Sequence, residues 1–255
     1  MPLLSLTVIG FFIGLVIIAL GGGGGGFYVG VLTALFNVPP AIAASTSLAT
    51  IIPTTTVGMI GHWKAGNVNF KLGSIMMISA IIGAILGSLC SDLVPEKYYN
   101  KITGILLLVL GIQMIVGFLK NKKKEMQQEK KYYKKSDFIK AVFYGILGGS
   151  LSGLVGISGT TPIVAGLMAL GCNILEVVGT SVFVLVGIST VGFLIHLGLG
   201  NVSWKLVFLL MLGTSTGALL APYILSKLNK NTVEKVLPPL IIVLTLTMGV
   251  IVVLK

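Results

Sequence analysis

Long apolar runs, separated by short polar turns, make up most of this chain. No Lys, Arg, Asp or Glu occurs between Met1 and Trp63, and six later runs are equally free of charge: 72–91, 102–119, 141–175, 177–204, 206–226 and 236–254. A helix needs about 20 apolar residues to cross the hydrocarbon core of a bilayer, and most of the runs reach that length. The pattern therefore predicts transmembrane helices.

The second pattern is an internal duplication. A shift of 134 positions (196 minus 62) places His62-x3-Gly66-Asn67-Val68 on His196-x3-Gly200-Asn201-Val202, and Thr46-Ser47 on Thr180-Ser181. No gap is needed over about 90 positions of this alignment. Membrane proteins built from two repeats are typically transporters, and their substrate sites lie between the repeats.

These patterns predict an all-α integral membrane protein of about eight transmembrane helices in two homologous four-helix repeats. The first repeat covers residues 1–119, a basic linker covers 120–137, and the second repeat covers 138–255. We expect the first helix of each repeat to break at glycines and to resume as a short segment, at 27–36 and 162–170. Three further helices are expected in each repeat, at 41–61, 72–91 and 100–119, and at 175–196, 205–226 and 233–254.

Two membrane topologies are open at this point. If each broken helix crosses the bilayer, each repeat crosses four times and the repeats are parallel. If the broken helix is re-entrant, each repeat crosses three times and the repeats are inverted. Basic loops stay in the cytoplasm. Inversion places Lys227, Lys230 and Lys235 in the cytoplasm, whereas the parallel arrangement places Lys205 and Lys255 there. The larger number of cytoplasmic lysines slightly favours inverted repeats.

Composition supports a protein embedded in lipid. Charged residues make up 10% of the chain, against about a quarter in soluble domains. The net charge of +11 does not indicate nucleic-acid binding, because nine of the eighteen lysines lie between Lys120 and Lys140. We expect this linker on the cytoplasmic face of a prokaryotic plasma membrane, near anionic lipids. Cys90 and Cys172 lack metal-ligand spacing, so neither a metal site nor a cofactor is expected.

Glycines interrupt the first apolar run of each repeat. Gly21 to Gly26 is a run of six glycines, and its counterpart is the segment from Gly153 to Pro162. Each glycine costs a helix up to about 1 kcal/mol relative to alanine. Unwound backbone at membrane depth is tolerated only where it is buried in protein or lines a cavity. Its free N–H groups and the positive end of the following helix favour a bound anion, and the chain has no arginine to bind one instead.

A polar stripe follows each break. Ser47, Thr55, Gly58 and His62 share one helical face, and Ser181, Ser189, Gly192 and His196 repeat it. We therefore predict a substrate site composed of Gly22, Gly23, Gly24, Gly25, Gly26, Thr46, Ser47, Gly156, Ser158, Gly159, Thr160, Thr161, Thr180 and Ser181.

The two histidines, His62 and His196, lie at helix ends beside turns that contain Asn67 and Asn201. Anchoring of the helix ends and a proton-linked or gating role both fit these positions. No Asp or Glu lies deep within an apolar run, so a carboxylate proton relay is not expected. Coupling to protons or to sodium, the direction of transport and the oligomeric state stay open.

At these residues the chain resembles the TauE/SafE sulfite exporter family, also called the toluene-sulfonate uptake permease family. The resemblance rests on the two glycine breaks, the Thr46-Ser47 and Thr180-Ser181 pairs and the turn around Gly66-Asn67, and it covers nearly the whole chain. It implies a secondary carrier for sulfite, sulfonates or sulfur-containing carboxylates. The family's break is usually followed by a proline, as at Pro162, whereas the first repeat has Tyr28 there. The two half-sites are therefore expected to be unequal.

The sequence leaves two alternatives to a carrier, an intramembrane protease and a non-transporting subunit. Gly156-Ile157-Ser158-Gly159 matches the Gly-x-Ser-Gly pattern of rhomboid intramembrane proteases, with His196 as a base for Ser158. The rhomboid pattern continues to a glycine where this chain has Ile163, and the duplication is foreign to rhomboids. A non-transporting membrane assembly subunit is the third alternative, but it leaves the paired breaks without a purpose.

Overall fold

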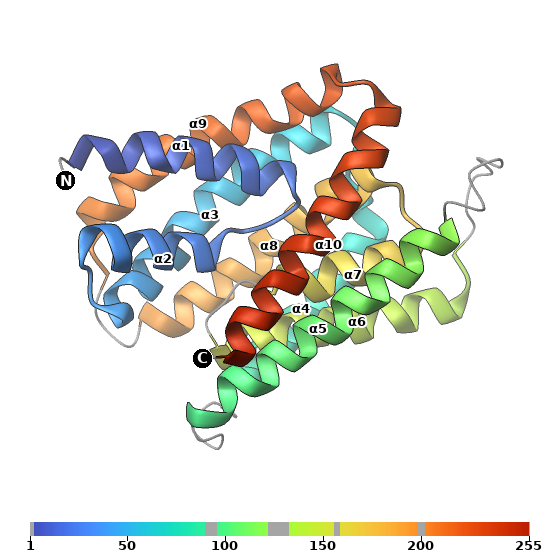
Figure 1. The fold of residues 1–255 in the computed structure, drawn as a ribbon, viewed down its shortest axis with the longest axis horizontal. Helices are drawn as coiled ribbons and strands as arrows, with labels where there is room; N and C mark the ends of the chain where they lie inside the picture. The colour runs from blue at the N-terminus through green and yellow to red at the C-terminus, as the bar shows by residue number, and fades with distance from the viewer. Residues whose placement is uncertain (1–2, 90–95, 122–132, 156–158, 198–201, 255) are drawn as a thin grey trace.

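The computed structural model describes residues 3–89, 96–121, 133–155, 159–197 and 202–254, and every regular element in these ranges is an α-helix. Figure 1 shows the helices of this part of the chain: α1 (Leu3–Ala19), α2 (Gly25–Phe36), α3 (Pro40–Lys64), α4 (Phe70–Leu89), α5 (Glu96–Asn121), α6 (Lys135–Val155), α7 (Thr160–Ala169), α8 (Ile174–Leu197), α9 (Trp204–Lys227) and α10 (Lys230–Leu254).

The helices follow the offset of the sequence duplication. Shifting α3 by 134 positions gives 174–198, which matches α8, and shifting α4 gives 204–223, which starts where α9 starts. The predicted break is confirmed in the first repeat, because α1 ends at Ala19 and α2 begins at Gly25. In the second repeat α6 ends at Val155 and α7 begins at Thr160, and residues 156–158 between them lie outside the described residues. Pro162 lies in the first turn of α7, as expected for a residue without a backbone N–H.

The equivalent helices α3 and α8 are antiparallel. Near the start of α3, the Thr46 hydroxyl accepts a hydrogen bond from the backbone N–H of Ser203, which follows the end of α8. Near the start of α8, the Thr180 hydroxyl accepts one from the N–H of Asn69, which follows the end of α3. Each helix therefore begins where the other ends, as Figure 1 also shows.

The broken helices turn back on themselves. Helix α9 runs parallel to α3, because Thr54 meets Thr214 and Gly61 meets Pro222. It also runs parallel to α1, because Gly213 packs on Thr7 and Gly217 on Phe11. Since α1 and α3 point the same way, α2 carries the chain back toward the end where α1 began (Figure 1).

The two repeats exchange their first helices. Helix α1 packs along α9 of the second repeat, and α6 packs along α4 of the first. Glycines allow both contacts, since a Cβ on Gly149 of α6 would overlap the carbonyl oxygen of Ala80 in α4. Cβ atoms on Gly83 and Gly87 of α4 would likewise overlap the backbone of α6, so small residues allow the close contact from both sides.

The outer surface is apolar and the hydroxyl groups are buried. Large apolar side chains on α4 such as Ile78, Leu86 and Leu89 are exposed, whereas Thr46, Ser47 and Thr180 are fully or almost fully buried. Four helical stretches among the described residues are long and apolar enough to cross a membrane: Phe70–Leu89, Ile174–Leu194, Trp204–Lys227 and Asn231–Ile251. This distribution is that of an integral membrane protein, because lipid solvates the apolar outside and the interior satisfies the polar groups.

The exchanged packing predicts a sharp difference between two glycines. Gly149→Leu should destabilise the protein by about 3 kcal/mol or more, because its side chain would overlap the backbone of α4. Gly30→Leu is the matched control, since a Cβ at Gly30 has no heavy atom within 4 Å. Thermal unfolding of the purified variants in detergent measures both. Equal stability of the two variants would contradict the α4–α6 packing.

Candidate functional site

The first break is a stretch of non-helical backbone between α1 and α2. Gly21 and Gly24 have φ angles of 75° and 78°, which residues with a side chain rarely adopt. The Gly22 N–H donates to the carbonyl of Ile17, and the Tyr28 N–H donates to that of Gly24. Gly25 and Gly26 therefore lie in the first turn of α2, where amide N–H groups have no acceptor within the helix.

The two breaks meet. The backbone N–H of Gly23 donates a hydrogen bond of 3.3 Å to the Thr160 hydroxyl. Thr160 is the first residue of α7, Thr161 is the second, and Gly159 is the N-cap. The first break is thus joined to the start of α7 by this bond. Gly156 and Ser158, also predicted for this site, lie outside the described residues.

Equivalent serines from both repeats hold the first break. The Ser47 hydroxyl on α3 donates to the carbonyl of Gly25 at 3.1 Å. The Ser181 hydroxyl on α8 is 2.7 Å from the carbonyl of Gly21 and 2.9 Å from that of Val178. These predicted site residues therefore fix the unwound backbone in place by satisfying its carbonyl groups.

The predicted threonines are adjacent to these serines in the sequence, but their hydroxyls bond the other repeat instead of the first break. Thr46 and Thr180 make the two reciprocal bonds that join α3 to Ser203 and α8 to Asn69, at 3.2 Å and 2.9 Å. Each hydroxyl still has its own hydrogen to donate, because it serves as the acceptor in this bond. The pair fastens the repeats to each other at opposite ends of the bundle.

His62 is completely buried near the end of α3. Neither of its ring nitrogens has a well-formed hydrogen bond among the described residues, although the backbone of Ile18 lies close by. The Asn67 carbonyl packs so closely on α8 that a Cβ at Gly179 would overlap it. His196 lies in the last turn of α8, and Asn201 lies outside the described residues.

A polar network lies at the linker end of the bundle, the end where α3 finishes and where α6 and α8 begin. It was not expected from the sequence. The Asn69 side-chain amide donates to a Glu176 carboxylate oxygen at 2.6 Å and to the Tyr133 hydroxyl at 3.1 Å. Burial raises the pKa of the Tyr133 phenol, which keeps it neutral. The network joins the α3–α4 turn to the start of α8 and to the residues that lead into α6.

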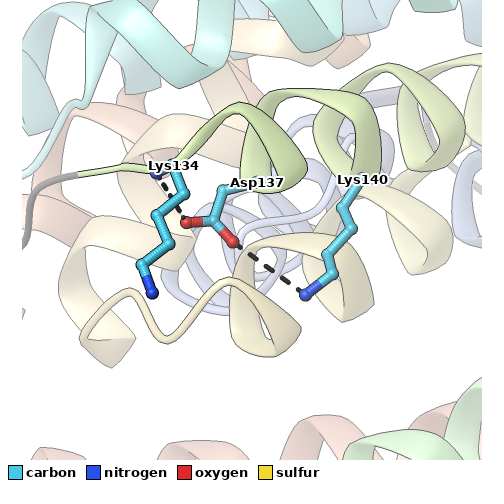
Figure 2. A network of polar contacts seen from close by, with 3 residues as sticks. All are labelled: Lys134, Asp137 and Lys140. Atoms are coloured by element: carbon cyan, nitrogen blue, oxygen red, sulfur yellow. Dashed lines mark hydrogen bonds and ion pairs between the residues drawn. The ribbon is translucent and has the colours of Figure 1, made fainter.

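The start of α6 is fixed by a local contact. The Asp137 carboxylate accepts a hydrogen bond from the Lys134 N–H at 3.0 Å and lies 3.9 Å from the Lys140 ammonium (Figure 2). An acidic residue in the first turn stabilises a helix by satisfying a free N–H and by its interaction with the helix dipole. This cap holds Tyr133, four residues upstream (137 minus 133), next to Asn69 and Glu176.

A comparison of unequal positions in the two repeats would have found this network. Asn69 and Glu176 correspond to Ser203 and Ile42 (69 plus 134, and 176 minus 134), so these two positions of the network are not repeated in the other half. Residues that the repeats share do not reveal such a network, because its members differ between the repeats.

The network predicts unequal effects of two substitutions at Glu176. Glu176→Ala should lower the free energy of unfolding by about 2 kcal/mol, because a charge-assisted hydrogen bond to Asn69 is lost. Glu176→Gln keeps an acceptor oxygen at the same place and should cost less than half as much. Thermal unfolding in detergent distinguishes them, and equal losses would show that the Asn69 bond contributes nothing.

The amino-acid sequence of the chain is similar to a known protein family and to several named proteins. The family model for the sulfite exporter TauE/SafE matches residues 6–250. Three proteins of Bacillus subtilis, each named a probable membrane transporter protein, are similar to the chain. YdhB is 30% identical over 82% of this chain and 84% of its own length. YtnM is 31% identical over 76% and 65%, and YunE is 25% identical over 93% of both chains. The chain therefore belongs to the TauE/SafE sulfite exporter family.

Proposed function

We propose that this protein is a secondary transporter that carries a small anion, either sulfite or an organosulfonate or sulfur-containing carboxylate, and that the anion binds between the two glycine breaks. The observation that carries the proposal is the meeting of the breaks at Gly23 and Thr160. Two helix starts converge there, and each presents N–H groups that have no partner within their own helix.

The available chemistry suits a weakly bound anion. Without arginine in the chain, the backbone N–H groups at the starts of α2 and α7 are the main donors that the breaks offer, and the Thr46 and Thr180 hydroxyls retain a hydrogen to donate. Uncharged donors hold an anion by dipoles, so the anion can leave again, which a carrier requires. Ser47 and Ser181 contribute indirectly, because their bonds to the carbonyls of Gly25 and Gly21 hold the first break in its conformation.

The helix directions support inverted repeats. In this arrangement α3, α4 and α5 cross the membrane and α1–α2 form a re-entrant unit, and the second repeat does the same with opposite orientation. Among the described residues, seven exposed lysines lie at the end of the helices next to the linker: Lys64, Lys71, Lys134, Lys135, Lys140, Lys227 and Lys235. Lys101 and Lys205 lie at the opposite end. On the positive-inside rule we propose that linker 120–137 lies in the cytoplasm, at the inner face of a plasma membrane.

We also propose a gating role for the turns with His62, Asn67, His196 and Asn201. Asn69 and Ser203, which follow these two turns in the chain, bond Thr180 and Thr46 near the start of the equivalent helix in the other repeat. Release of one bond at a time would open the breaks to one side of the membrane and then to the other.

Flux across liposomes tests the proposed function. Sulfite and small sulfonates are loaded with and without imposed proton and sodium gradients. Thr160→Val keeps the shape of the side chain but removes the acceptor for the Gly23 N–H, so the flux should fall by about tenfold or more. Saturable flux in the wild type that falls in this variant supports the site. No flux of any sulfur anion would refute the substrate class.

Thr247→Val is the matched control, because the exposed Thr247 hydroxyl bonds only to its own helix at Val243. Its flux should equal that of the wild type. Gly159→Leu is less informative than Thr160→Val, since a Cβ at Gly159 would overlap the carbonyl of Gly148 and disturb the packing of α6 on α7.

A further inference from the structure

One half of the molecule contains a cluster of buried hydroxyls that the other half lacks. The hydroxyl cluster consists of Tyr28 on α2, Thr54 on α3 and Thr214 on α9, all of them 0% exposed. At the corresponding positions (28 plus 134, 54 plus 134, 214 minus 134) the other half has three buried apolar residues, Pro162, Ile188 and Ala80. Since the surrounding helices are repeated, the cluster is a specific addition to one half.

The three hydroxyl groups converge. The Thr54 and Thr214 oxygens are 2.6 Å apart. The Tyr28 hydroxyl lies beside both, but it makes no hydrogen bond of good geometry among the described residues. Leaving a hydroxyl buried without a partner costs roughly 1–3 kcal/mol, so a protein core without a ligand would favour phenylalanine here.

Hydrogen-bond accounting identifies the charge of the ligand. The Thr54 hydroxyl donates to the Thr50 carbonyl at 2.8 Å, so the Thr214 hydroxyl donates to Thr54 at 2.6 Å, and the Met211 carbonyl at 3.5 Å is a weaker acceptor for the same hydrogen. The only hydrogen left to give is that of Tyr28, whereas lone pairs remain on all three oxygens. A group rich in lone pairs and poor in hydrogens suits a cation rather than an anion.

The surrounding helices limit the charge of the cation. Helices α1, α2, α3 and α9 carry no Asp or Glu, so no carboxylate on them would balance a divalent ion. Hydroxyl oxygens are hard ligands, which suits an alkali-metal ion and not a soft metal.

We propose that the hydroxyl cluster of Tyr28, Thr54 and Thr214 is a binding site for a small monovalent cation, sodium, distinct from the anion site at the breaks. The cluster adjoins the first break, because a Cβ on Gly24 would come within 3.1 Å of the Tyr28 ring. A cation there and an anion at the break attract each other in a medium of low dielectric constant, so each raises the affinity of the other. This coupling rests on the proposed function, whereas the cation site itself does not.

Sodium-dependent thermal unfolding of the purified protein, without any substrate, tests the site. Sodium chloride is varied at constant ionic strength against choline chloride, with potassium chloride as a second series. The wild-type midpoint should rise with sodium and saturate, because a ligand that binds only the folded state stabilises it. Thr214→Val and Tyr28→Phe should each raise the half-saturating concentration by about tenfold or more.

Matched variants make the outcome decisive. Thr190→Val removes an exposed hydroxyl that bonds only within α8 and should leave the sodium response unchanged. Tyr28→Phe keeps the buried ring, so it carries the test if Thr214→Val does not fold. The absence of a sodium-specific rise in the wild type, or an equal rise in Tyr28→Phe, would overturn the proposal. A sodium response without anion flux in liposomes would leave the cation site standing and refute the proposed transport function.

Discussion

The need to pair backbone N–H and C=O groups away from water governs this structure. A glycine break exposes such groups in the middle of a protein that lipid surrounds, where each unpaired group costs free energy. The fold meets this need with hydroxyls from both repeats, since Ser47 and Ser181 bind carbonyls of the first break and Thr160 binds one of its N–H groups. The break is therefore stable only where the two repeats meet.

The duplication makes the two repeats similar in structure, and the positions at which they differ make the two ends of the bundle unequal. The bonds of Thr46 and Thr180 are equivalent, but Glu176, Asn69 and Tyr133 strengthen only the linker end. Buried hydroxyls beside Tyr28 occur in one half only. A carrier with two identical halves would behave alike from both sides of the membrane, whereas these differences allow the two sides to be distinguished.

The sequence predicted what depends on local chemistry and missed what depends on contacts. The helices of the described residues and the first break follow from apolar length and glycine, and they lie close to the expected positions. The exchange of α1 and α6 between the repeats was not predicted, because glycine spacing shows that a helix packs closely but not on which partner. The serines and threonines were predicted as substrate ligands, which stays a prediction, whereas their bonds to backbone across the repeats required the structure. Gly156, Ser158 and Asn201 lie outside the described residues, so their predicted roles stay predictions.

The exchange of first helices has a consequence for biosynthesis. Gly14 packs on Thr214, 200 positions later in the chain (214 minus 14). At a synthesis rate of about 5–20 residues per second, α1 waits on the order of ten seconds or more in the membrane before its partner exists. Ser47 is already present by then, but Thr160 and Ser181, which also bind the first break, are not. The first break therefore reaches its full set of hydrogen bonds only after most of the chain has been made.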